Sequence, residues 1–216
     1  MILAVDVGNS NTTVGLFNGT GELLFRALLE TSRSKTRDQC AIELLGIRTG
    51  LNIKAEIHNQ LGSDIVASSV AAIAKYPSPI VMVDMGTATS LSLIVGSVYE
   101  GCIIMPGLAL ALDALSERAA ALPPISIETA SPVGLMGHTT EEAMRSGVLY
   151  GHASMVDGML ERIEESIGQS VTTVATGGNA PRILRYCKRP IQYDADLIMT
   201  GLYLLYQKNA KKYRKA

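Results

Sequence analysis

The chain has 216 residues, of which 47% are hydrophobic, 18% are charged and 20 are glycine, so it has ample material for a globular core. Its formal net charge of −1 and its pI near 6.3 give no electrostatic basis for binding nucleic acid or an anionic membrane. Three widely spaced cysteines argue against a disulfide framework or a zinc site. The sequence shows no basic leader and no apolar run of about 18 residues, which predicts a soluble, cytoplasmic protein.

The first predicted element is a β-hairpin over residues 2–17, ILAVDVGNSNTTVGLF, and its pattern returns 78 residues later in residues 80–95, IVMVDMGTATSLSLIV. In each copy an apolar strand runs into Asp-x-Gly, then into small polar residues and a second apolar run. Gly8 and Gly86 permit tight turns, and the N–H and hydroxyl donors after them suit phosphate oxygens. A pair of ordinary hairpins is the alternative, but the shared register favours a duplicated phosphate-binding loop.

Neither familiar nucleotide fingerprint is present, because the chain contains no G-x-G-x-x-G that opens a helix and no G-x-x-x-x-G-K-[ST]. Strand-like residues follow each Asp-x-Gly, so the motif belongs to a hairpin. A duplicated loop of this kind resembles the sugar kinase, actin and Hsp70 superfamily, in which two related domains hold ATP between them.

The elements outside the two hairpins follow from apolar periodicity and from turn residues. They are a strand over 22–29, a helix capped by Thr36 or Asp38 and ending at Gly46, a helix over 62–74, a strand over 102–105, a helix over 108–122, an amphipathic helix over 146–167, a strand over 171–175 and a helix over 197–206. Residues 51–61 show no period, residues 99–101 and 176–179 read as turns, and Thr139 or Thr140 caps a helix with Glu142. Strand-then-helix order in both halves predicts an α/β fold, and the duplication predicts two domains, 1–78 and 79–216.

Several short motifs occur together in a fixed order. They are DVGNSN at 6–11, GSD at 62–64, DMGTAT at 84–89, MPG at 105–107, TTEEAMRSG at 139–147 and ATGG at 175–178. Each motif is weak alone, but the set resembles the type III pantothenate kinase (CoaX) family over nearly the whole chain. The resemblance implies two related actin-like or RNase H-like domains with ATP in the cleft, and the phosphorylation of pantothenate to 4'-phosphopantothenate, the first step of coenzyme A biosynthesis.

The resemblance also implies roles for individual residues. The first phosphate loop would comprise Asp6, Val7, Gly8, Asn9, Ser10, Asn11, Thr12 and Thr13. Within it, Asp6 would hold Mg²⁺ through water. Thr87 would contact ATP, Asp84 would bind a monovalent cation such as K⁺ or NH₄⁺, and Gly177 and Gly178 would leave room for adenine.

Asp64 matches the general base that takes the proton from the pantothenate hydroxyl. The substrate contacts implied with it are Gly62, Ser63, Asp64, Ile65 and Thr140. Without the resemblance, Asp64 and Thr140 also fit ordinary positions at helix starts, and Gly177 and Gly178 fit an ordinary turn. The three histidines, His58, His138 and His152, have no partner at metal-ligand spacing and are predicted to be surface or core residues.

Three departures from the family pattern bear on activity. The family usually reads Gly-Ala-Asp-Arg where this chain has Ile65 after Asp64, and a tyrosine of the pantothenate site aligns with Ala55. Near residues 46–48 the chain lacks a strand–helix–strand stretch of the first domain, and this loss is expected to expose apolar surface.

Three functional hypotheses follow. The first is a homodimeric pantothenate kinase that uses ATP, Mg²⁺ and a monovalent cation. The second is a non-catalytic family member that acts as a binding or regulatory protein, like the Bvg accessory factor branch. The third is a kinase of the same superfamily that acts on another small hydroxyl substrate. The broad apolar stripe of residues 146–167 favours the dimer.

Overall fold

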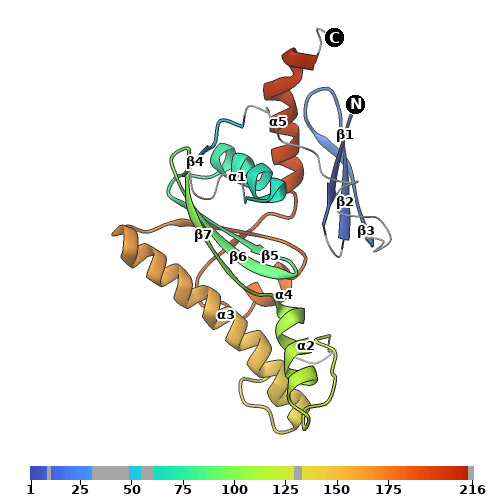
Figure 1. Cartoon of the computed structure of the whole chain (residues 1–216), viewed down its shortest axis with the longest axis vertical. Coiled ribbons are helices and arrows are strands. Elements are labelled where there is room, and N and C mark those ends of the chain that lie inside the picture. Colours follow the sequence, from blue (N-terminus) through green and yellow to red (C-terminus); the bar gives the residue numbers. More distant parts are fainter. Residues whose placement is uncertain (9–10, 31–48, 55–60, 129–132, 214–216) are drawn as a thin grey trace. The chain divides into compact units, whose positions relative to one another are not determined.

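The computed structural model describes residues 1–8, 11–30, 49–54, 61–128 and 133–213 (Figure 1). The chain divides into two compact units. Unit 1 comprises Met1–Ile80, Leu93–Gly101 and Ala195–Ala216, and unit 2 comprises Val81–Ser92 and Cys102–Asp194. The helix expected to end at Gly46 lies outside the described residues, and the domain division at residue 78 stays a prediction.

Unit 1 contains a three-stranded antiparallel sheet in the order β1-β2-β3. Its strands are β1 (Ile2–Val7), β2 (Asn11–Phe17) and β3 (Leu23–Glu30). The first hairpin and the third strand predicted from the sequence are confirmed. The register sets Asp6 opposite Thr13, so the first Asp-x-Gly lies where β1 turns into β2.

One face of this sheet packs on helix α5 (Leu197–Tyr213), which also lies beside helix α1 (Ser63–Lys75) (Figure 1). Phe17 stacks on Tyr203 with 4.9 Å between the ring centroids, and Met199 is fully buried in the same cluster. A Cβ at Gly201 would lie 1.9 Å from the carbonyl oxygen of Ala67, so only glycine permits the close approach of α5 to α1.

The opposite face of the sheet is apolar and exposed. The register aligns Leu3, Leu16 and Phe25 in one row across the three strands. The exposed fractions of Leu3 and Phe25 are 64% and 57%, whereas the solvated face of an antiparallel sheet is usually polar.

The second sheet has six strands in the order β4-β7-β6-β5-β8-β9. They are β4 (Asn52–Ile53), β5 (Ile80–Met85), β6 (Ala88–Val95), β7 (Val98–Pro106), β8 (Thr172–Thr176) and β9 (Gln192–Tyr193). Strands β5 and β6 are neighbours joined by Gly86 and Thr87, which confirms the second predicted hairpin. Every residue of β5 except Asp84 is buried, as its apolar sequence requires.

Unit 2 also contains helices α2 (Leu108–Arg118), α3 (Thr140–Ile167) and α4 (Ala180–Leu184), with α3 packed against both of the others. The predicted helix over 146–167 begins earlier and forms one continuous helix from Thr140. Its buried stripe includes Val156 and Leu160, while Met155 and Met159 are only partly buried.

Some expectations from the sequence were wrong. The turn expected at residues 99–101 lies instead at Gly96, whose φ of +61° only glycine adopts readily. Tyr99 is consequently a fully buried strand residue paired with Ile53 of β4.

Other element boundaries also moved. Helix α2 ends at Arg118 instead of residue 122, because a turn closed by the Leu122 N–H and the Ala119 carbonyl precedes the two prolines. Helix α4 and the short strands β4 and β9 were not predicted, and α5 continues past residue 206.

Candidate active site

Strand β1 delivers the carboxylate of Asp6 to the end of the first hairpin. The side chain is half-buried, and burial, followed by the negative charge of Asp64, raises the pKa of Asp6 to about 6. A half-buried carboxylate beside a second carboxylate is poorly stabilised as an anion, and a cation would relieve both causes.

Asp64 lies in the first turn of α1 and is exposed. Its Oδ1 accepts a hydrogen bond of 2.8 Å from the Ile65 N–H, so the carboxylate is held at the helix N-terminus, where the helix dipole favours negative charge. A Cβ at Gly62 would lie 2.3 Å from that oxygen, so any larger residue at position 62 would clash with the carboxylate in this position. The structure thus brings Asp6 and Asp64 together within unit 1, although they are far apart in the sequence.

In unit 2, Asp84 occupies the corresponding place at the end of β5 and is half-buried. Gly177, just after β8, has a φ of +93°, and a Cβ there would lie 2.7 Å from Asp84 Oδ1 and 2.6 Å from the Met85 carbonyl oxygen. Position 177 therefore requires glycine both for its backbone conformation and for the closeness of the Asp84 carboxylate.

Backbone contacts shape the turn that carries Thr87. The Gly86 N–H donates to the Ala88 carbonyl at 3.0 Å, and a Cβ at Gly107 would lie only 2.2 Å from the Thr87 carbonyl oxygen. On the other side, Asn179 donates to the Gly86 carbonyl from its side chain at 3.2 Å. The roles of Gly107 and Asn179 were not predicted from the sequence. Both residues belong to features noted there, Gly107 to the MPG motif at 105–107 and Asn179 to the predicted turn at 176–179.

A buried polar pair links the second hairpin to α3. The Thr89 hydroxyl lies 2.9 Å from Nε2 of His152, and the exposed fractions of the two residues are 1% and 5%. Burial lowers the pKa of His152, so the neutral imidazole is favoured there. His152 is therefore a hydrogen-bonded core residue, in agreement with the prediction.

At the start of α3, Thr139 is the N-cap, because its hydroxyl accepts the Glu142 N–H at 3.2 Å. The Glu142 carboxylate accepts the His138 N–H at 2.8 Å, so the predicted pairing of a threonine with Glu142 is confirmed with Thr139 as its threonine. Thr140 is the first helical residue and is exposed.

The remaining predicted site residues vary in how fully they are described. Asn9, Ser10 and Ala55 lie outside the described residues. Val7, Gly8, Ser63 and Gly178 are exposed, while Thr12 and Ile65 are partly buried and Thr13 is buried. In the described part of the chain, no group of three His, Cys, Asp or Glu side chains forms a ready metal site.

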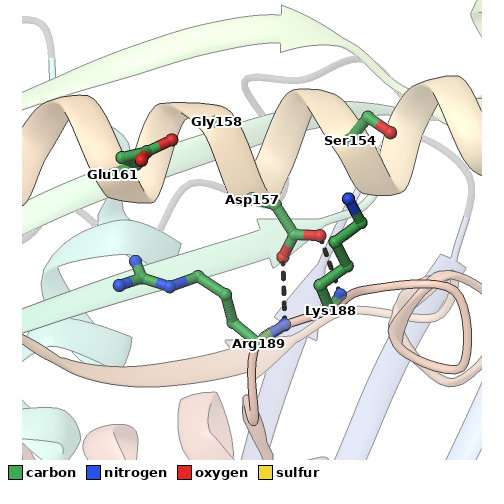
Figure 2. Close-up of a pocket in the computed structure, with 6 residues that line it drawn as sticks. All are labelled: Ser154, Asp157, Gly158, Glu161, Lys188 and Arg189. Atoms are coloured by element: carbon green, nitrogen blue, oxygen red, sulfur yellow. Dashed lines mark hydrogen bonds between the residues drawn. The ribbon is translucent and has the colours of Figure 1, made fainter.

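A hollow of about 360 Å³ opens between α3 and the Lys188–Arg189 loop in unit 2 (Figure 2). Asp157 of α3 accepts the backbone N–H groups of Lys188 at 2.8 Å and of Arg189 at 3.4 Å, which anchors the loop to the helix. None of the predicted site residues lines this hollow.

The fold is a mixed α/β arrangement that this chain shares with solved structures of other proteins. A Campylobacter jejuni protein described as a Baf family transcriptional activator matches with a TM-score of 0.63 and 20% identity over 97% of this chain and 100% of the other. Component A of the Acidaminococcus fermentans (R)-2-hydroxyglutaryl-CoA dehydratase matches with a TM-score of 0.58 and 12% identity over 97% and 98% of the two chains. At these identities, the two structures share a fold with this chain and carry no information about its activity.

The model of the type III pantothenate kinase family matches residues 42–162. A Bacillus cytotoxicus protein named type III pantothenate kinase is 34% identical over 257 aligned positions, which cover 97% of this chain and 97% of the relative. The chain belongs to the type III pantothenate kinase family, a family of kinases. Among the described residues, no helix combines the length and apolarity that crossing a membrane requires.

Proposed function

We propose that this chain transfers the γ-phosphoryl group of ATP to the terminal hydroxyl of pantothenate, the first step of coenzyme A biosynthesis, in the cytoplasm. The observation that carries the proposal is the closeness of Asp6 and Asp64 in unit 1, on a chain whose relatives are named type III pantothenate kinase. Phosphoryl transfer depends mainly on positioning and charge neutralisation, and two neighbouring carboxylates can divide those tasks.

Asp64 is the general base in this proposal. It accepts the proton of the pantothenate hydroxyl as the oxygen attacks the γ-phosphorus. Its exposed position in the first turn of α1 leaves the carboxylate accessible to a substrate, and the Ile65 N–H keeps it oriented. The exposed residues Gly62, Ser63 and Thr140, together with Ile65, are proposed to contact pantothenate.

The nucleotide is proposed to bind along residues 6–13, at Thr87, and beside Gly177 and Gly178. The residues present fit a divalent cation at Asp6, because its half-buried carboxylate, next to that of Asp64, has a pKa raised to about 6. Mg²⁺ bound there would neutralise phosphate charge on ATP. Asp84 and the close backbone of Gly177 form the proposed site for K⁺ or NH₄⁺.

The finer architecture is also part of the proposal: two related actin-like domains, 1–78 and 79–216, the first without a segment that the family carries. An alignment of 257 positions that uses 97% of a 216-residue chain leaves more than 40 positions facing a gap in this chain. The apolar row of Leu3, Leu16 and Phe25, in which Leu3 and Phe25 are exposed and Leu16 is partly buried, supports the loss of covering structure from the first domain.

The second candidate is a non-catalytic binding or regulatory protein. The residue after Asp64 favours this candidate. It is Ile65 here, where the family usually has an arginine that would help bind the substrate. The proposed loss of a segment from the first domain also favours the non-catalytic protein.

A coupled assay of ADP release with pantothenate, with and without K⁺, separates the candidates. The enzyme hypothesis expects pantothenate-dependent ADP release that Asp64→Asn abolishes. ADP release with another small alcohol and none with pantothenate would redirect the substrate assignment. Nucleotide binding without turnover on any alcohol would support the non-catalytic protein.

A further inference from the structure

Asn179 joins the glycine turn after β8 to the turn of the second hairpin. Its backbone N–H donates to the Met85 carbonyl at 3.1 Å, and its side-chain Nδ2 donates to the Gly86 carbonyl at 3.2 Å. The residue is half-buried and directly follows Gly177 and Gly178. One asparagine therefore ties the turn proposed to face adenine to the turn that carries Thr87.

The orientation of the Asn179 amide is fixed by its second partner. Arg182 donates from Nη1 to Asn179 Oδ1 at 3.2 Å, and a guanidinium can only donate, so the atom that faces it must be the oxygen. The NH₂ group is then left facing the Gly86 carbonyl, which can only accept. Arg182 also donates from Nη2 to Glu128 Oε1 at 2.6 Å, and this exposed ion pair holds the guanidinium in place.

The bond to Gly86 has a consequence for the next residue. The Gly86 C=O and the Thr87 N–H belong to one planar trans peptide, in which they point in opposite directions. Fixing the Gly86 carbonyl with the Asn179 amide therefore also fixes the direction of the Thr87 N–H. Gly107, which lies against the Thr87 carbonyl, restricts the following peptide in the same way.

We propose that Asn179 is a positioning residue that aims the Thr87 peptide at the nucleotide and keeps the glycine turn in register with it. The inference rests on the proposed function, because it takes Thr87, Gly177 and Gly178 as nucleotide contacts. Asn179 itself acts through Gly86, and Arg182 acts through Asn179.

The discriminating variant is Asn179→Asp, which keeps the size and Oδ1 but sets an acceptor against the Gly86 carbonyl. We expect its Kd for a fluorescent ATP analogue to rise about tenfold, as the loss of one oriented hydrogen bond allows. The KM for ATP should rise by a similar factor, while kcat and the KM for pantothenate change less than about twofold. Loss of folded protein alone would lower the apparent kcat and leave the KM for ATP unchanged.

Arg182→Met frees the Asn179 amide to rotate without replacing it, so it tests the same mechanism if Asn179→Asp folds poorly. Arg182→Lys keeps a donor and should restore most of the affinity, and Asn179→Asp combined with Arg182→Met should cost no more than Asn179→Asp alone. Arg185→Gln, on an exposed residue just after α4, is the matched control and should bind normally.

Unchanged nucleotide affinity in both Asn179→Asp and Arg182→Met, with an unmodified chain that binds ATP, would overturn this inference and leave the proposed function standing. An unmodified chain that binds no ATP would overturn both. Binding is measured at equilibrium, so the test does not depend on turnover.

Discussion

Asp6, at the end of β1, and Asp64, in the first turn of α1, lie close enough for the charge of Asp64 to help raise the pKa of Asp6 to about 6, burial being the larger cause. The half-buried Asp6 is suited to a cation, and the exposed Asp64 is suited to accept a substrate proton. This difference in environment supports different roles for two residues of the same type.

The first prediction concerns Asp64→Asn. The amide keeps the shape of the side chain but cannot accept the substrate proton, so phosphoryl transfer should fall by at least about a hundredfold while ATP binding changes little. The measurements are ADP release and the equilibrium affinity for ATP. Asp113→Asn, on an exposed residue of α2, should leave both unchanged. An Asp64→Asn variant that keeps most of its turnover would remove Asp64 from the role of base.

The second prediction concerns stability against pH in the absence of Mg²⁺. The pKa of Asp6 is about 6 in the folded chain and near 3.8 when unfolded, so the unfolded state loses its proton first as the pH rises. Asp6 should therefore lower the free energy of unfolding between about pH 4 and pH 6, with the full penalty above pH 6. Allowing for partial solvent screening, the penalty is on the order of 1–2 kcal/mol.

Asp6→Asn removes this titration. The variant should be more stable than the unmodified chain at pH 7 and nearly equal to it at about pH 3, below the unfolded pKa of Asp6, as measured by urea unfolding in EDTA. If the free energy of unfolding changes with pH in the same way for both proteins, the raised pKa of Asp6 is contradicted. A gain in stability joined to a loss of Mg²⁺-dependent activity would show that the carboxylate is kept for function.

The hairpins could be predicted because their information is local: apolar runs, Asp-x-Gly and β-branched residues follow one another in both copies. Helix α1 was equally clear, since small residues lie between Gly62 and the Pro77 region. The start of β7 could not be predicted, because Tyr99-Glu100-Gly101 has the composition of a turn. Strand β7 lies between β6 and the short strand β4, which shows no pattern of its own, and this place in the sheet makes Tyr99 a core strand residue.

The candidate site was predicted as residue types and not as contacts. Asp6 and Asp64 were both chosen from the sequence, but their mutual repulsion depends on packing within unit 1. Asn179 stood in a predicted turn, yet an asparagine in a turn usually bonds its own backbone, and its bond to Gly86 spans distant parts of the chain. Long-range polar contacts of this kind leave no periodic signal in a single sequence.

A third prediction concerns the monovalent cation. K⁺ or NH₄⁺ should be required for turnover, and Asp84→Ala should remove both the activity and its response to K⁺, because the carboxylate balances the charge of the ion. Added K⁺ should also raise the Tm of the unmodified chain and leave that of Asp84→Ala unchanged. Full activity in a buffer whose only monovalent cation is choline would contradict the assignment.

The last prediction concerns helix α3 and assembly. Val156 and Leu160 are buried within the chain, whereas Met155 and Met159 are only partly buried on the same helix. Methionine adapts well to a packed surface, and two copies of one helix can bury such a stripe by self-complementary packing about a two-fold axis. We therefore expect a homodimer at micromolar concentration.

Met159→Glu should shift the mass measured by light scattering toward the monomer, because the interface would have to bury an unpaired charge. Glu165→Lys changes an exposed charge on the same helix and should leave the dimer intact. A circular dichroism melt of Met159→Glu separates dissociation from unfolding, since a folded monomer keeps a cooperative transition. A monomeric mass for the unmodified chain, together with a cooperative melt, would contradict the dimer. Unit 2 would then be stable through its internal core alone, and Met155 and Met159 would be ordinary surface residues.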